Sequence, residues 1–275
     1  MKLETRDLNR PIITLLTDFG TQDYFVGAMK GVIFSLNPET RIIDITHEIS
    51  PQDIPGAAFN LLACYRDFPK STIHIAVVDP GVGSQRRPLL VECGGQFFVG
   101  PDNGIFSWVC EREGNWRAVH LTNNNFFRHP VSKTFHGRDI FAPVAAALSK
   151  EVPGQEFGEQ VSDIVMLESL QPGSNGAGEI EGSVIHIDRF GNCVTNLTRE
   201  NVYNNNLAAG AKLFVNAQEI SSFREFFADD HHDNAELFCV FGSAGFLEIA
   251  ARNSSAAKML NIQRGDRVIL TSETS

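Results

Sequence analysis

The sequence has few of the features that mark secreted, membrane-spanning or metal-binding proteins. It has only five cysteines, an odd number without a close C-x-x-C pair, which argues against a disulfide framework and against a zinc site. No stretch reaches the roughly 18 apolar residues that span a bilayer, and the charged N-terminal residues lack the apolar run of a signal peptide. We therefore expect a cytoplasmic protein that has neither a membrane segment nor a bound metal.

Positive charge is also scarce. The chain carries 23 Lys and Arg against 33 Asp and Glu, a formal net charge of -10. Such a surface repels nucleic-acid phosphates and anionic lipids at long range. With 43% hydrophobic and 20% charged residues the chain has an ordinary globular composition. These values predict a folded protein whose partner is a small molecule, with no role for nucleic acid or a membrane.

The first part of the chain has the pattern of an α/β domain. Residues 12–16 and 73–78 form apolar runs without alternation, which is typical of strands covered on both faces. Helical patterns lie between such runs, at 26–36, 53–68, 104–113 and 139–151. We predict an N-terminal α/β domain over residues 1–170, with a mostly parallel sheet flanked by helices.

The second part of the chain has a different sequence pattern, rich in short strand-like segments. Residues 168–182 are the only stretch dense in Gly, Ser and Pro, which favours a domain boundary there. Several short segments with strand character follow, among them 182–198, 245–251 and 266–271. This pattern predicts a smaller C-terminal β-barrel domain over residues 171–275.

Two aspartates each follow an apolar strand of the first domain. Asp18 lies in the segment TDFG and Asp79 begins DPGVG. In an open α/β sheet, ligands bind beyond the carboxyl ends of the strands, so two carboxylates placed there can converge on one polar ligand such as a vicinal diol. The alternative is that both segments are only turns, since Asp, Pro and Gly favour turns.

An arginine and a histidine complete the candidate site of this domain. Arg86 follows Asp79 on a Gly-rich loop that can fold its guanidinium back onto the carboxylate, although it can also be an ordinary surface charge. His136 precedes a predicted helix, where it can titrate near neutrality. Three other histidines lie in or beside strands and are expected to be core or hydrogen-bonded residues: His47, His74 and His186.

The second domain offers Asp188, Phe190 and Asn192 at the end of a predicted strand. The segment can be a plain hairpin turn, or a site where an aromatic face, an amide and a carboxylate meet a planar heterocycle and an amine. Ser243 and the pair Asn253–Ser254 lie in small polar loops whose backbone could approach a ligand.

Six motifs occur in one order from about Pro11 to the C-terminus: TDFG, VVDPGVGSQRR, GPDNG, FHGRDIFAP, IDRFGNCVTNL and SAGFLEIAARNSSA. Together they resemble the S-adenosyl-L-methionine (SAM) hydrolase family, also called SAM hydroxide adenosyltransferases, which are relatives of the fluorinases and chlorinases. The resemblance implies hydrolysis of SAM to adenosine and L-methionine without a cofactor or metal. It also implies a homotrimer with active sites between neighbouring subunits.

The resemblance further implies a role for each candidate residue. Asp79, Arg86 and His136 match the trio that places or deprotonates the water attacking C5′ of the ribose, and Asp18 matches the carboxylate that grips the ribose hydroxyls. The remaining matches surround the rest of the substrate: Phe190 and Asn192 on the nucleoside, Asp188 and Ser243 at the amino and carboxylate ends of methionine, and Asn253 and Ser254 near adenine.

The sequence departs from the halogenating relatives in ways that favour water over halide. Those relatives carry aromatic and hydroxyl residues in place of Asp79 and residues 80–82, and a halide-binding serine in place of Gly137. They also have a long insertion where residues 93–96 join two strands tightly here.

Three other functions stay open at this point. A metal-dependent phosphohydrolase could use Asp18, Asp79 and His136 as ligands, although it would want a tighter cluster. A non-catalytic adenosine- or SAM-binding protein would keep the diol-gripping and aromatic residues without needing the trio. A SAM-dependent halogenase is the third.

Overall fold

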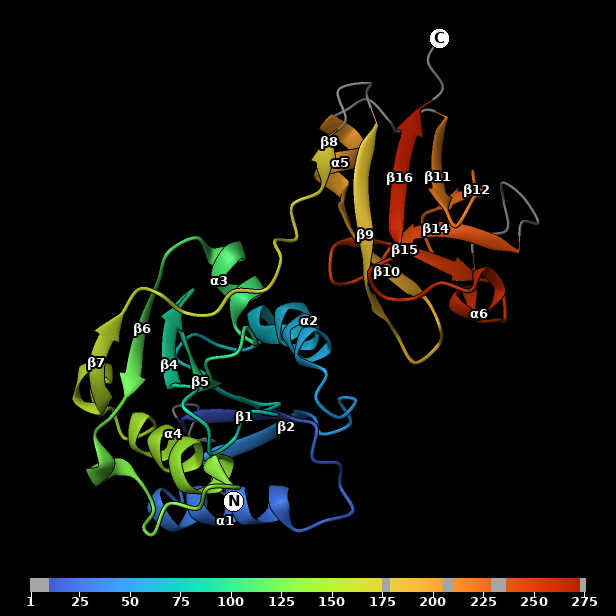
Figure 1. Ribbon diagram of the computed structural model, residues 1–275. Coiled ribbons are helices and arrows are strands. Elements are labelled where there is room, and N and C mark those ends of the chain that lie inside the picture. The colour runs from blue at the N-terminus through green and yellow to red at the C-terminus, as the bar shows by residue number, and fades with distance from the viewer. Residues whose placement is uncertain (1–9, 175–178, 205–209, 229–235, 273–275) are drawn as a thin grey trace, which may run out of the picture. The chain divides into compact units, whose positions relative to one another are not determined.

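The computed structural model describes residues 10–174, 179–204, 210–228 and 236–272 (Figure 1). The chain forms two compact units, Met1–Glu168 and Ser169–Ser275, and each is described here by itself. We had predicted the division between residues 170 and 171. The N-terminal residues 1–9, which contribute to the prediction of a cytoplasmic location, lie outside the described residues.

The first unit is built on a mixed sheet. The strand order is β2 (Arg41–Thr46), β1 (Ile12–Thr17), β3 (Ile73–Val77), β5 (Gln96–Pro101), β4 (Pro88–Cys93), β6 (Trp116–Leu121) and β7 (Gly158–Val161). Strands β2, β1, β3 and β5 are parallel, whereas β5, β4, β6 and β7 pair antiparallel. The expected mostly parallel sheet thus describes only one half. Gly94 and Gly95 both have positive φ and join β4 to β5 in a tight hairpin, which makes that pair antiparallel.

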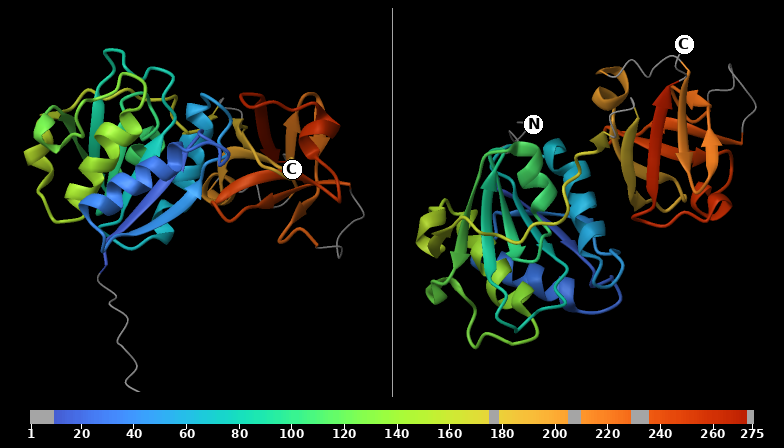
Figure 2. Two further views of the ribbon diagram at one scale, coloured as in Figure 1. Left: turned by 90° about the horizontal axis from the view of Figure 1, so that it is seen from below. Right: turned by 45° about the horizontal axis from the view of Figure 1, so that its top comes forward.

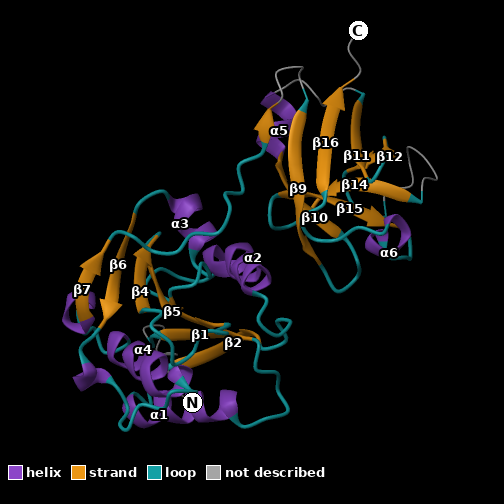
Figure 3. Cartoon of the chain, viewed as in Figure 1, coloured by secondary structure: helices purple, strands orange, loops and turns teal. Residues whose placement is uncertain are grey.

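Helices cover both faces of this sheet, as Figures 2 and 3 show. On one face α1 (Phe25–Leu36) and α4 (Ala142–Leu148) pack side by side, and on the other lie α2 (Ile54–Cys64) and α3 (Ser107–Glu113). The strands need cover on both faces because their residues are apolar without alternation. On one face Ile13 and Leu15 of β1 are fully buried in a core with Met29 of α1. The shorter helical segments of the unit are Tyr65–Asp67, Asn124–Phe126, Gly137–Phe141 and Gly154–Phe157.

The second unit is a sheet that curls into a half-barrel. Its order is β12 (Gln218–Ile220), β11 (Ala211–Val215), β16 (Arg267–Ser272), β9 (Ile180–Ile187), β10 (Cys193–Thr198), β15 (Phe246–Ala251), β14 (Leu237–Phe241) and β13 (Phe223–Arg224), and β8 (Gly173–Ser174) pairs with β9. Two short helices, α5 (Arg199–Asn204) and α6 (Ala256–Leu260), accompany it. Leu213, Leu247 and Val268 are fully buried between its strands. Closure into a full barrel stays a prediction.

Within the described parts of the chain, no helix has both the length and the apolar character needed to cross a membrane.

His74 is buried in the first unit, and we expect it to make folding sensitive to acid. Its Nδ1 lies 2.8 Å from Thr14 Oγ1, and its ring stacks on Phe98 with the centroids 4.9 Å apart. Burial lowers the pKa of His74 from 6.5 to about 4. His74 is therefore protonated near pH 6.5 in the unfolded chain but only near pH 4 in the folded chain. Because the unfolded state binds the extra proton between these values, the free energy of unfolding should fall by roughly 3 kcal/mol as the pH drops from about 6.5 to about 4.

Urea unfolding followed by tryptophan fluorescence measures this loss, because both tryptophans, Trp108 and Trp116, belong to the first unit. His74→Phe should be less sensitive to pH over the same window by roughly 3 kcal/mol. The control is His120→Phe, at a partly exposed position of β6. Equal pH dependence in wild type and His74→Phe would contradict the assignment.

Candidate active site

The loops after β1 and β3 bring two predicted carboxylates to one cavity. The two strands are parallel neighbours, so Asp18 and Asp79 leave the sheet at the same edge. Both line a cavity of about 380 Å³, whose other walls include Gln52, Pro80 and Phe135. One oxygen of Asp18 accepts a hydrogen bond of 2.8 Å from the backbone N–H of Gln52. The turn alternative alone does not describe these segments, because the turns present both carboxylates to a shared space.

Asp79 and Arg86 form a buried bidentate ion pair. Arg86 Nε donates to Asp79 Oδ1 at 3.0 Å, and Arg86 Nη2 donates to Asp79 Oδ2. Only 5% of the Asp79 side chain and 10% of the Arg86 side chain are exposed. The guanidinium also lies over the ring of Phe141, 5.5 Å from its centroid. Arg86 is therefore a fixed charge and not a solvated surface residue.

Arg86 connects this pair to His136, which is distant along the chain. Arg86 Nη2 lies 2.7 Å from His136 Nδ1. A guanidinium has only donors, so Nδ1 must accept and the ring proton lies on Nε2. Burial lowers the pKa of His136, and the positive charge of Arg86 lowers it further. The imidazole is therefore a neutral group that offers an N–H at Nε2.

A buried carboxylate holds the segment that carries His136. Asp139 is fully buried, and it accepts hydrogen bonds from Arg138 Nε at 2.7 Å, Ser132 N at 2.9 Å and Arg128 Nη1 at 3.1 Å. Burial alone would raise the pKa of Asp139, but these hydrogen bonds and the charge of Arg138 outweigh it and lower the pKa. The segment before α4 is thus tied at several points, which orients His136.

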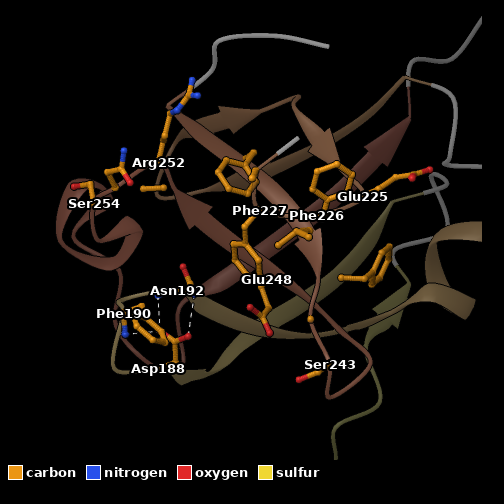
Figure 4. Close-up of a pocket in the computed structure, with 17 residues that line it drawn as sticks. Asp188, Phe190, Asn192, Glu225, Phe226, Phe227, Ser243, Glu248, Arg252 and Ser254 are labelled. Carbon is orange, nitrogen blue, oxygen red and sulfur yellow. Dashed lines mark hydrogen bonds between the residues drawn. The ribbon is translucent and has the colours of Figure 1, made fainter. Parts of the chain in front are cut away.

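The six candidate residues of the second unit line one pocket of about 1100 Å³ (Figure 4). They are Asp188, Phe190, Asn192, Ser243, Asn253 and Ser254. Asp188 accepts hydrogen bonds from the backbone N–H of Phe190 at 2.9 Å and from the Asn192 backbone and side chain at 2.8 and 2.9 Å. The side chain of Phe190 stays exposed, which leaves an aromatic face free for a planar ligand.

Sequence reasoning missed several residues of this pocket. Phe226 and Phe227 are exposed aromatic residues on its wall, and their adjacency in SSFREFF was the available signal. Glu248 was also missed, although a carboxylate inside the apolar strand Phe246–Ala251 is unusual. Burial raises the pKa of Glu248 to about 7, and the negative charge of Asp188 adds to this shift. Gly242 makes room for the carboxyl, because a Cβ there would lie 1.7 Å from Glu248 Oε1.

No group of three or more His, Cys, Asp or Glu side chains in the described residues has the arrangement of a metal site. The alternative that uses Asp18, Asp79 and His136 as metal ligands has no support from this geometry, because Asp79 and His136 both contact a guanidinium.

Comparison with known proteins gives consistent matches over both units. Residues 13–158 match the SAM hydroxide adenosyltransferase N-terminal domain, and residues 182–269 match the C-terminal domain of the same family. A (R)-S-adenosyl-L-methionine hydrolase of Methanocaldococcus jannaschii is 36% identical, with 98% of each chain covered. A fluorinase of Nocardia brasiliensis is 24% identical, with 96% of this chain and 97% of the fluorinase covered.

The fold has a solved counterpart as well. The crystal structure of a conserved protein from Thermotoga maritima superposes with a TM-score of 0.86 at 35% identity, covering 94% of this chain and 99% of the other. Both family domains match this chain, and a relative above 30% identity covers nearly all of it. These matches establish the family. The chain belongs to the SAM hydroxide adenosyltransferase family.

Proposed function

We propose that this protein is a SAM hydrolase, which converts SAM and water to adenosine and L-methionine. The observation that carries the proposal is the Asp79–Arg86–His136 network, in which one guanidinium joins a carboxylate and a neutral imidazole beside the cavity that Asp18 also lines. The relatives named as (R)-S-adenosyl-L-methionine hydrolases support this choice of substrate.

The chemistry requires activation of water more than activation of the leaving group. The sulfur of SAM is a sulfonium, so it departs as a neutral thioether and needs no proton. Water must be held about 3 to 3.5 Å from C5′, opposite the sulfur. Asp79 either accepts a proton from the water or orients the water through a hydrogen bond. The Nε2–H of His136 donates a hydrogen bond to the water oxygen. When Asp79 takes the proton, Arg86 stabilises the resulting hydroxide, whose negative charge is used up as the oxygen bonds to C5′ and the C5′–S bond breaks. Asp79 then releases the proton to solvent.

The other candidate residues would bind the rest of the substrate. Asp18 would grip the ribose hydroxyls. In the pocket of the second unit the proposed contacts are Phe190 and Asn192 to the nucleoside, Asp188 and Ser243 to the amino and carboxylate ends of methionine, and Asn253 and Ser254 near adenine. We further propose a cytoplasmic homotrimer with active sites between neighbouring subunits, a closed C-terminal barrel, and a reaction that needs neither metal nor cofactor.

Incubation of the purified protein with SAM and a chelator, followed by chromatography, tests the function. Adenosine and L-methionine in equal amounts are the expected products. Absence of adenosine, or activity only after addition of a divalent metal, would refute a metal-free hydrolase. Tight binding of adenosine without turnover would identify a binding protein instead. A 5′-halogenated nucleoside formed in the presence of chloride or fluoride would identify a halogenase.

Glu248 should make SAM binding depend on pH. Because its pKa is raised to about 7, the side chain is mostly neutral at pH 6 and mostly ionised at pH 8. SAM carries a net positive charge, so its affinity should increase about three- to tenfold over this range. Calorimetric titration measures the change, with Asp79→Ala as the background so that the substrate is not consumed.

The matched variant is Glu248→Gln, which keeps the shape of the side chain and removes its charge. Its affinity should change less with pH than that of the parent. If the pH dependence is the same with Glu or Gln at this position, Glu248 does not sense the charge of the ligand.

A further inference from the structure

The proposed role of Asp18 depends on the position of the turn that carries it. This turn, residues 17–20, leaves β1 and ends at Gly20, which has φ +67°. Within the described residues, the Asp18 carboxylate accepts one hydrogen bond, from Gln52 N to its Oδ2 atom. The direction of the other oxygen therefore depends on how the turn itself is held.

His47 contacts both ends of this turn. Its Nδ1 lies 2.9 Å from Thr17 Oγ1, and its carbonyl oxygen accepts a 2.8 Å hydrogen bond from Gly20 N. Thr17 Oγ1 in turn accepts from the backbone N–H of Phe19 at 3.2 Å. Asp18 thus lies between two residues that His47 holds.

A charged pair on the other side of the ring orients the imidazole. His47 Nε2 lies 3.1 Å from Asp44 Oδ1, and Lys30 Nζ donates to Asp44 Oδ2 at 2.6 Å. Burial alone would raise the pKa of Asp44, but the hydrogen bond from Lys30 and the nearby imidazole of His47 lower it, which keeps the carboxylate charged. A carboxylate beside Nε2 favours the proton there, so Nδ1 accepts from the Thr17 hydroxyl.

We propose that His47 is a positioning residue, which holds the 17–20 turn so that Asp18 faces a ribose diol. His47 is 5% exposed and Thr17 is fully buried, so water does not compete for their contact. The proposal rests on the proposed function, because it names a support for the residue that grips the nucleoside. His47 does not touch the ligand in this account and acts only through the turn.

Two substitutions separate the contacts of His47. Asn can place an amide oxygen where Nδ1 lies, so His47→Asn keeps the contact with Thr17 and loses the one with Asp44. Gln reaches the place of Nε2, so His47→Gln keeps Asp44 and loses Thr17. His120→Gln, on β6, is the control for a histidine replaced elsewhere in the same unit.

Calorimetry with adenosine and 2′,3′-dideoxyadenosine reads out the grip on the diol. Asp18→Ala should weaken adenosine about tenfold or more and leave the dideoxy compound unchanged. His47→Gln should show the same pattern at about three- to tenfold, and His47→Asn and His120→Gln should stay within about twofold. In an Asp18→Ala background His47→Gln should cause no further loss.

The outcomes that overturn the proposal are distinct from failure of the proposed function. Equal weakening of both nucleosides by His47→Gln, or a further loss in the Asp18→Ala background, would show a merely structural role. Amide hydrogen exchange of residues 17–21 in the ligand-free protein is an independent measurement, in which exchange at Gly20 should rise in His47→Gln and not in His47→Asn. Unchanged exchange in His47→Gln overturns the positioning role, even if the wild type binds neither nucleoside and the proposed function has failed.

Discussion

Asp79→Ala is expected to reduce SAM turnover by about a thousandfold or more while leaving the dissociation constant for adenosine within about threefold. Asp79 contacts Arg86 and lines the cavity with Asp18. In the proposed mechanism its carboxylate acts on the attacking water and not on the ribose. Single-turnover kinetics and calorimetry with adenosine measure the two quantities separately.

Asp79→Asn is the matched variant, because it keeps the size of the side chain and removes its charge. A comparable loss of turnover in both variants would assign the effect to the charge of the carboxylate. Equal losses of turnover and of adenosine affinity in Asp79→Ala would show that Asp79 grips the ligand, and the proposed mechanism would then be wrong.

Arg86→Met should destabilise the first unit by about 3 to 5 kcal/mol and also abolish turnover. The substitution leaves the Asp79 carboxylate, only 5% exposed, without the guanidinium that compensates its buried charge. The double variant Asp79→Asn/Arg86→Met removes both charges, so it should recover most of the stability but none of the activity. Urea unfolding followed by the fluorescence of Trp108 and Trp116 measures the stability.

Arg66→Met is the control for loss of an ion pair at the surface. The side chain of Arg66 is 59% exposed and pairs with Glu113, so this variant should lose less than about 1 kcal/mol. A double variant as unstable as Arg86→Met would show that the guanidinium stabilises the unit through its packing on Phe141 and not through Asp79.

Much of the fold follows from local patterns. The apolar runs before Asp18 and Asp79, which show no alternation, are buried strands, as predicted. Such a run can bury the side chains on both of its faces only in a sheet that helices cover on both sides. The direction of strand pairing was harder to predict. Residues 89–92 and 97–100 have the pattern of two more apolar strands, and their antiparallel arrangement depends on the two-glycine hairpin between them.

Some residues of the candidate site could likewise be found from the sequence, and others only from the structure. Asp18 and Asp79 were readable because each ends a strand, and neighbouring parallel strands bring their carboxyl ends to one edge. The unusual position of Glu248 inside an apolar strand was visible in the sequence, but its raised pKa was not. That shift arises from burial and from the charge of Asp188, which lies 60 residues earlier in the chain.

By itself the sequence determined the α/β and β-rich character of the two parts, the two strand-end carboxylates and the family resemblance, because these depend on residue order and short-range periodicity. Only the tertiary structure decided that Arg86 binds both Asp79 and His136, that His47 holds the turn of Asp18, and that half of the first sheet is antiparallel. The physical reason is that hydrogen bonds and burial form between segments far apart in the chain. His136 lies 50 residues from Arg86, and no local pattern encodes a contact over that separation.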